Sequence, residues 1–196
     1  MDAGVLRARA LSRQAAGPMK YWFCLRAGFQ SHGRDSNLPA GANPEFLRRA
    51  IALATDNVTQ GKGGPFGAVV VHEGRIVGEG ANAVTSSNDP TAHAEVNAIR
   101  AAAKALNTFS LAGCELYTSC EPCPMCLAAA YWARVDAIYY GACAADAARA
   151  GFDDAFLYAE LRKEIAARIL PATQLLRDEA QASFEKWISA PDKIAY

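Results

Sequence analysis

Residues 115–142 read ELYTSCEPCPMCLAAAYWARVDAIYYGA, and the order of elements in this stretch decides the fold. Its first four residues, 115–118, predict a short strand. Proline is favoured at the start of a helix, so Pro122 predicts a helix that runs to Arg134. Residues 135–142 are apolar again and predict a second strand. The stretch therefore reads strand, helix, strand, with cysteines at the start of the helix.

The sequence on either side continues this alternation. Asn43 is a helix cap, Pro44 suits the first helical position, and apolar residues then repeat at helical spacing until Gly61. The other expected elements are strands at 66–72 and 75–80, a helix at 92–106, a helix at 153–166, a short strand at 174–176 and a closing helix at 179–189. This order predicts an α/β protein with three layers, α/β/α, around a central mixed sheet of five strands.

Composition limits the classes of function. The chain has 196 residues, of which 52% are hydrophobic and 20% charged, as expected for one ordinary globular domain. Its longest apolar runs are far shorter than the roughly 20 residues of a membrane span, so no membrane association is expected. Residues 45–196 carry 18 acidic against 14 basic side chains. Without a basic excess, we expect no nucleic-acid partner.

The first 44 residues differ from the rest. They are rich in Arg, Ala, Gly and Ser, show no sustained period, and predict a mostly disordered extension before one folded domain at 45–196. An organelle transit peptide, a translation start at Met19 and a plain extension all stay open. The chain has six cysteines but nothing that resembles a secretory signal, so the reducing environment of the cytoplasm is the expected location.

Two predicted helix starts carry the chemistry. His93 and Glu95 lie at one, Cys123 and Cys126 at the other. Cysteines three apart in a first helical turn share a face and can chelate one ion. Side-by-side helix starts would place His93, Cys123 and Cys126 around one Zn²⁺ per chain. Three protein ligands leave the fourth position to water, the arrangement of a catalytic zinc site, and Glu95 would move protons.

Two other classes of protein share part of this pattern. Cys120, Cys123 and Cys126 have the opening spacing of an iron–sulfur run, which would indicate electron transfer. The expected fourth cysteine is missing, because position 130 is alanine, and a cluster would leave the histidine and the glutamate unexplained. A zinc-ribbon interaction module needs two paired knuckles, and only one exists.

His-x-Glu followed by Pro-Cys-x-x-Cys resembles the cytidine-deaminase superfamily. Within it, residues 45–196 resemble the bacterial guanine deaminases. The stretches that carry this resemblance are Gly63–Ala68, Ser87–Glu95, Ser119–Cys126 and Gly151–Asp154. The resemblance implies the cytidine-deaminase-like fold and hydrolysis of guanine to xanthine and ammonia. Deamination of guanosine, cytosine or tRNA adenosine stays open as an alternative.

The same resemblance implies a set of residues around a small purine substrate. They are Phe66, Asn82, Ala94, Trp132, a second catalytic carboxylate at Asp154, and Tyr196 of the partner subunit. Without the resemblance, Asn82 would be a turn residue, the two aromatic residues would be core or interface residues, and Asp154 would be stabilised by a helix dipole alone.

The end of the chain is expected to form a dimer contact. Phe184, Trp187 and Ile188 make an apolar face on the last predicted helix, which Pro191 ends. The resemblance implies a domain-swapped homodimer in which residues 178–196 cross over and close the pocket of the partner.

Overall fold

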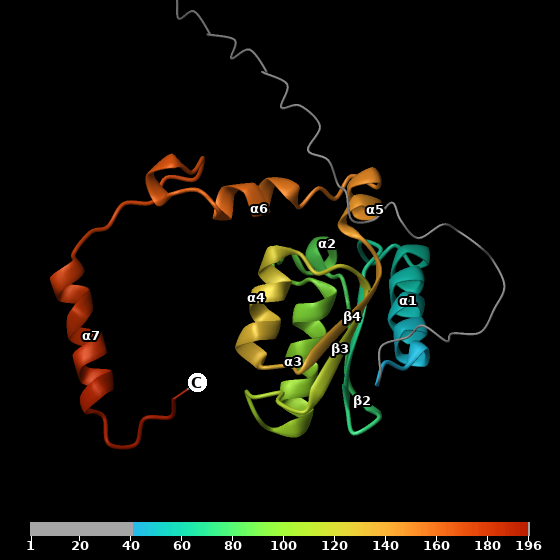
Figure 1. The fold of residues 1–196 in the computed structure, drawn as a ribbon, viewed down its shortest axis with the longest axis horizontal. Helices are drawn as coiled ribbons and strands as arrows, with labels where there is room; N and C mark the ends of the chain where they lie inside the picture. Colours follow the sequence, from blue (N-terminus) through green and yellow to red (C-terminus); the bar gives the residue numbers. More distant parts are fainter. Residues whose placement is uncertain (1–40, 196) are drawn as a thin grey trace, which may run out of the picture. The chain divides into compact units, whose positions relative to one another are not determined.

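The computed structural model describes residues 41–195, so most of the expected extension lies outside the described residues, and Tyr196 does too. Its elements in chain order (Figure 1) are α1 (Pro44–Thr59), β1 (Gly67–His72), β2 (Arg75–Ala81), α2 (Val84–Ser87), α3 (Ala94–Leu106), β3 (Cys114–Cys120), α4 (Pro124–Ala133), β4 (Ala137–Ala142), α5 (Ala144–Arg149), α6 (Ala155–Leu161), the 3-10 turn Ile165–Ala167 and α7 (Arg177–Ser189). Within residues 41–195, no helix is both long and apolar enough to cross a membrane.

The sheet has the strand order β2-β1-β3-β4. Strand β1 runs antiparallel to both β2 and β3, whereas β3 and β4 are parallel. Parallel neighbours need a crossover connection, and α4 supplies it. The predicted mixed sheet is therefore confirmed, and the strand–helix–strand order read from residues 115–142 forms one half of it.

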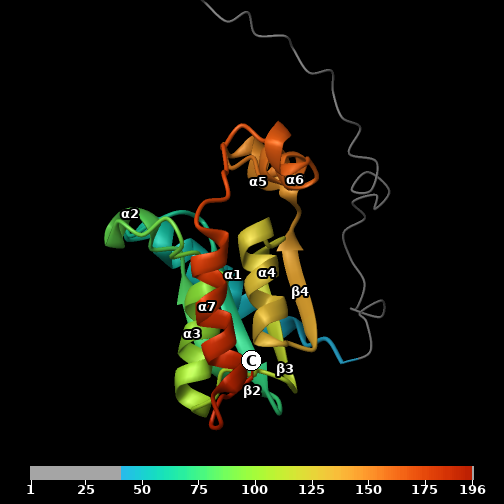
Figure 2. The ribbon, with the colours of Figure 1, turned by 90° about the vertical axis from the view of Figure 1, so that its left-hand side faces the viewer.

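Helices cover both faces of this sheet. On one face, Phe46 and Leu47 of α1 pack against Val69, Val71 and Tyr117. On the other face, α3 and α4 lie side by side, and their alanines pack on the opposite side of β1 and β3 (Figures 1 and 2). The three-layer α/β/α arrangement expected from the order of elements is thus present.

The predicted fifth strand is wrong. In the described residues the sheet has four strands, and residues 174–176 are irregular. Leu176 has a positive φ of 51°, a left-handed conformation that a strand residue does not adopt, and α7 starts directly after it. Leu175 and Leu176 are 76% and 69% exposed, so these residues cover no part of the core.

The helix expected at 153–166 is also shorter than predicted. The carboxylate of Glu160 accepts a hydrogen bond from the backbone N–H of Ile169 at 2.8 Å and pairs with Lys163. These bonds fold the chain back on the end of α6, which stops at Leu161. A separate 3-10 turn at Ile165–Ala167 follows.

Two glycines of β2 bring α3 against the sheet. A Cβ atom on Gly80 would lie 2.2 Å from the carbonyl oxygen of Ala94, and one on Gly78 would lie 2.5 Å from that of Ala98. No side chain fits at these positions without a shift of the helix backbone. Gly80 therefore fixes the first turn of α3, which carries Glu95 and directly follows His93, and Gly78 fixes the turns after it.

Candidate metal centre and substrate pocket

The ligand-type side chains stand at the caps of two helices. His93 is the N-cap residue of α3 and Cys123 that of α4, with Pro124 behind it at the first helical position. Both caps have extended backbone, and neither side chain caps its own helix. The side chains of His93 and Cys123 are therefore both available to bind an ion that lies beyond the helix ends. Cys126, one turn further into α4, is fully buried.

The three donor atoms have the spacing of a tetrahedral zinc site. The Nδ1 atom of His93 lies 3.5 Å from Sγ of Cys123 and 3.5 Å from Sγ of Cys126. Zinc bonds of about 2.0 Å to nitrogen and about 2.3 Å to sulfur at tetrahedral angles put the two donors about 3.5 Å apart. Among the described residues, only these three His, Cys, Asp or Glu side chains form such a group. They fit the metal.

The electrostatics of the two cysteines favour metal binding. The hydrogen bond from Cys126 lowers the pKa of Cys123 far below the ordinary thiol value, and the contact with His93 acts in the same direction. The same hydrogen bond, together with burial, raises the pKa of Cys126. The contact with Cys123 raises the pKa of His93. A metal bound to these three side chains would displace protons that they hold in its absence.

Glu95 lies beside this group without belonging to it. The side chain is 5% exposed, and burial raises its pKa. Its Oε1 atom is 3.3 Å from the hydroxyl of Thr118, and its Oε2 atom is 3.4 Å from Sγ of Cys126. A buried carboxyl group next to a metal site, with a pKa moved towards neutrality, is suited to accept and return a proton.

A pocket of about 460 Å³ opens over these residues. Its lining comprises Gly61, Gly63, Gly64, Phe66, Asn82, Val84, Thr85, His93, Glu95, Cys120, Glu121, Cys123, Ala147, Phe152 and Asp154. Phe66 and Phe152 meet edge to face, with ring centroids 4.9 Å apart. Two aromatic rings beside several polar groups are typical of a pocket for a flat heterocycle.

Asn82 has a fixed orientation at the pocket. Its Oδ1 atom accepts hydrogen bonds from the backbone N–H groups of Gly64 and Val84, each at 3.3 Å. The side-chain amide therefore offers its N–H donors to a ligand.

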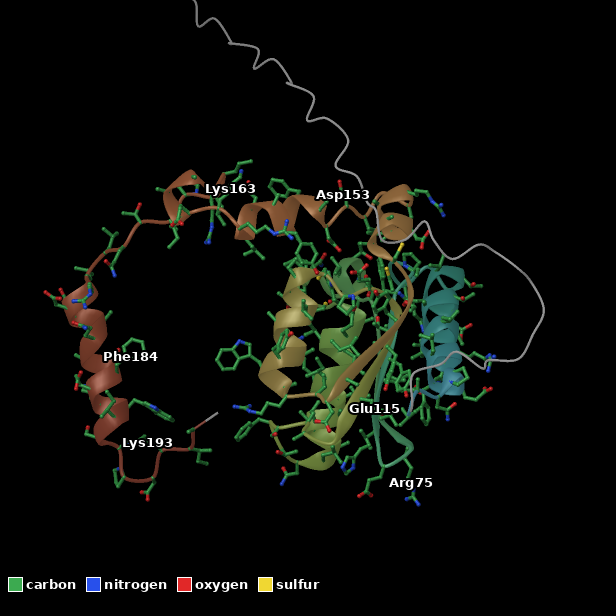
Figure 3. All side chains as sticks on the ribbon, in the orientation of Figure 1. Arg75, Glu115, Asp153, Lys163, Phe184 and Lys193 are labelled. Atoms are coloured by element: carbon green, nitrogen blue, oxygen red, sulfur yellow. The ribbon has the colours of Figure 1, made fainter. Side chains whose placement is uncertain are left out.

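The two neighbouring aspartates divide their roles. The carboxylate of Asp153, labelled in Figure 3, accepts the N–H of Ala155, the first residue of α6, at 2.9 Å. Asp154 lines the pocket instead, and burial raises its pKa. The hydroxyl of Tyr158 donates to the carbonyl of Pro122 at 3.3 Å and ties α6 to the loop before Cys123.

The structure does not bring every predicted site residue to the pocket. The side chain of Ala94 is fully buried in the core below α3. Trp132 is 65% exposed on α4 and is not among the lining residues. Cys120 does line the pocket, where burial raises its pKa to about 11. It is not part of the donor group, and the iron–sulfur interpretation has no support within residues 41–195.

Phe152 lines the pocket but was not predicted as a site residue, although it lies in the stretch Gly151–Asp154 that carries the resemblance. The available signal was an aromatic residue two positions before a candidate catalytic carboxylate. Thr85 and Glu121 also line the pocket and carried no recognisable signal.

Comparisons with known proteins agree with this geometry. The family described as the cytidine and deoxycytidylate deaminase zinc-binding region matches residues 42–142. Guanine deaminase of Bacillus subtilis (strain 168) is 54% identical over 151 residues, which cover 77% of this chain and 97% of that protein. The tRNA-specific adenosine deaminase of Aquifex aeolicus is 42% identical over 97 residues, 50% of this chain and 64% of that protein.

Two solved structures extend the comparison to the fold. The X-ray structure of guanine deaminase from Bacillus subtilis has a TM-score of 0.77 at 52% identity and covers 79% of this chain and 99% of that one. Guanine deaminase from Nitrosomonas europaea has a TM-score of 0.52 at 28% identity, with 80% and 98% covered.

Proposed function

Because this chain belongs to the cytidine and deoxycytidylate deaminase zinc-binding family, we propose that it is a zinc-dependent hydrolase that converts guanine and water to xanthine and ammonia. The observation that carries this proposal is the juxtaposition of a zinc-type donor triangle with a buried carboxyl group at the same pocket. The similarity to guanine deaminases spans nearly the whole length of those proteins, whereas the adenosine deaminase of Aquifex aeolicus matches half of this chain.

His93, Cys123 and Cys126 would hold the zinc ion. When bound, zinc lowers the pKa of a coordinated water from 15.7 to about 7, which supplies a nucleophile at neutral pH. The remaining chemistry belongs to the chain. A bond forms between the water oxygen and C2 of the purine, and the bond from C2 to the exocyclic nitrogen breaks.

Glu95 is the general base and general acid of this reaction. It takes one proton from the attacking water and delivers it to a ring nitrogen of the purine. It then takes the second proton from the hydroxyl now bound to C2 and passes it to the exocyclic nitrogen, which leaves as ammonia while the C2 oxygen becomes a carbonyl. Burial raises the pKa of Glu95 above the ordinary carboxyl value, the direction that favours a group that both accepts and donates protons. A positioned general acid and base contributes about 10² to 10⁴ in rate.

The purine would lie between aromatic and polar groups. Phe66, together with Phe152, offers an apolar contact to its ring, and the amide of Asn82 offers donors to a ring nitrogen or carbonyl. Asp154 is proposed to contact the purine and assist proton transfer. Tyr196 of the partner subunit remains a proposed substrate contact, and so do Ala94 and Trp132, although neither of these two lines the pocket within this chain.

The active form is proposed to be a homodimer that exchanges its C-terminal segments. Two observations support the exchange. Every residue of α7 is exposed, including the apolar Phe184, Trp187 and Ile188, and Figure 3 labels Phe184 on this helix. An apolar face that packs against nothing within the chain is typical of a contact surface. Helix α4 has an exposed aromatic surface that such a segment could cover, because Tyr131 and Trp132 are 78% and 65% exposed.

A substrate panel tests the proposal. Ammonia release would be followed for guanine, guanosine, cytosine, cytidine and adenine with zinc-loaded protein. We expect guanine to have a kcat/KM at least about tenfold above every other compound, a difference of about 1.4 kcal/mol. If guanosine or cytosine is preferred, the substrate assignment is wrong although the deaminase family still holds.

A further inference from the structure

One face of the central strand β3 is buried at every position. Cys114, Leu116, Thr118 and Cys120 point to the side of the sheet covered by α3 and α4, and none is more than 5% exposed. Leu116 and Cys114 pack there against alanines of the two helices. Thr118 is the one hydroxyl in this row and is 1% exposed.

A buried hydroxyl needs a hydrogen-bond partner, because leaving it unpaired is costly. The partner of Thr118 is the Oε1 atom of Glu95, at 3.3 Å. Thr118 and Glu95 come from a strand and a helix 23 residues apart in the chain. The contact therefore joins the carboxylate to the centre of the sheet.

The two oxygens of Glu95 face different surroundings. Oε1 lies at Thr118, while Oε2 lies 3.4 Å from Sγ of Cys126 at the donor triangle. The Thr118 hydroxyl is thus the side-chain donor to Oε1, while Oε2 faces one of the three side chains that would hold the metal.

From this geometry we propose that Thr118 is a positioning residue, whose hydroxyl holds Oε1 of Glu95 and so keeps Oε2 directed at the metal ligands and the reacting water. The inference rests on the proposed function, because it assigns Thr118 to the proton transfers of Glu95. Thr118 does not line the pocket, so it acts only through the glutamate.

Three substitutions separate the hydroxyl from the packing of the side chain. Thr118→Val keeps the shape and removes the hydroxyl, whereas Thr118→Ser keeps the hydroxyl and removes a methyl group. Ser119→Ala removes the neighbouring hydroxyl on the opposite face of β3, where Ser119 accepts the N–H of Gly67 at 3.0 Å. It is the matched control.

The measurements are kcat and KM for guanine, the zinc content per chain and the dissociation constant of xanthine. We expect Thr118→Val to lower kcat by about tenfold to a hundredfold, as misplacement of a catalytic group by about 1 Å does. KM, zinc content and xanthine binding should stay within about threefold of wild type. Thr118→Ser should restore at least half of the wild-type kcat, and Ser119→Ala should leave kcat within about twofold.

Three results would overturn the inference: a kcat of Thr118→Val equal to wild type, a serine variant as impaired as the valine variant, or loss of zinc in Thr118→Val. If the valine variant does not fold, Thr118→Ala takes its place with the same expectation. Wild-type protein is assayed in parallel. If wild type itself fails to release ammonia from guanine, the proposed function fails, whereas a normal wild type with an unaffected valine variant contradicts only the role of Thr118.

Discussion

Asn57 donates its side-chain amide to the backbone carbonyl of Asn82 over a distance of 2.8 Å, although 25 residues separate the two in the chain. The same amide donates to the carbonyl of Gly64 at 2.9 Å. Asn57 is 5% exposed and lies on α1. This one buried side chain therefore holds both the loop before β1, at Gly64, and the residue that follows β2, Asn82. The orientation of Asn82 towards the pocket depends on these two segments.

Asn57→Asp should therefore damage stability and substrate binding together. The aspartate has the same shape but no N–H donors, and it faces two carbonyl oxygens. We expect a loss of about 1–3 kcal/mol in the free energy of unfolding and a raised KM for guanine. Denaturant unfolding and steady-state kinetics measure the two effects.

Asn107→Asp is the control for charge, since Asn107 is exposed beyond the end of α3. A negative charge at a helix C-terminus costs at most about 1 kcal/mol, and KM should not change. Equal effects of the two substitutions would show that Asn57 has no special role.

Gly80→Ala should loosen the metal centre. The new Cβ atom would lie 2.2 Å from the carbonyl of Ala94, so the first turn of α3 must move. We expect a destabilisation of about 1–3 kcal/mol and weaker zinc binding, measured by competition with a chelator. Glu79→Ala is the control on the same strand, because it removes only the exposed ion pair with Arg49. It should cost at most about 1 kcal/mol and leave zinc affinity unchanged, and an equal loss of zinc affinity in both variants would contradict this account.

Tyr117→Phe should change how stability depends on alkaline pH. Burial raises the pKa of Tyr117 to about 12, whereas an unfolded tyrosine has a pKa of about 10. The neutral phenol is thus favoured by folding: its contribution is fully present below pH 10 and is lost as the pH rises towards 12. Unfolding free energies between pH 8 and about 11.5 should fall less steeply in Tyr117→Phe than in wild type. Tyr131→Phe, on a 78% exposed side chain, should keep the wild-type slope, and identical slopes in all three proteins would refute the assignment.

Subunit complementation tests the exchanged C-terminal segment. Deletion of residues 191–196 and His93→Ala should each abolish turnover, for lack of the pocket cap and of a metal ligand respectively. In mixed dimers, one of the two sites has an intact metal centre and an intact partner tail. Random pairing makes half of the dimers mixed, so roughly a quarter of wild-type activity should return after subunit exchange. No recovery despite demonstrated exchange would mean that each tail serves its own subunit.

Much of the fold could be predicted because strong local signals agree with the tertiary structure. Asn43 does cap α1, with its side chain accepting the N–H of Glu45. The helix predicted to open at Pro122 is present as α4, but it starts at Pro124, with Cys123 as its N-cap residue. The turn at Glu73 and Gly74 joins β1 to β2, with both residues at positive φ. The spacing of His93, Cys123 and Cys126 also predicted that their donor atoms come together. These residues lie at the starts of α3 and α4, so the group forms wherever the two helix starts are adjacent.

Other features depend on contacts that a sequence pattern does not express. Helix α5 was not predicted, since its cap is Cys143, which pairs with Asp146 in a capping box and is not a usual cap residue. Residues 174–176 were predicted as a strand, but a strand needs a neighbouring strand to pair with, and Leu176 takes a left-handed conformation instead. Phe152 becomes a pocket residue only through its contact with Phe66.

Guanine deamination by this chain is proposed to need zinc on His93, Cys123 and Cys126 and proton transfer by Glu95. Its most direct test is ammonia release from guanine as zinc is added back to metal-free full-length protein, for wild type and Glu95→Gln. Wild-type turnover should rise from none and level off at about one zinc per chain, as three protein ligands predict. Glu95→Gln should bind the same amount of zinc with about 10² to 10⁴ times less turnover. Turnover in the metal-free protein, or full turnover in Glu95→Gln, would contradict the account.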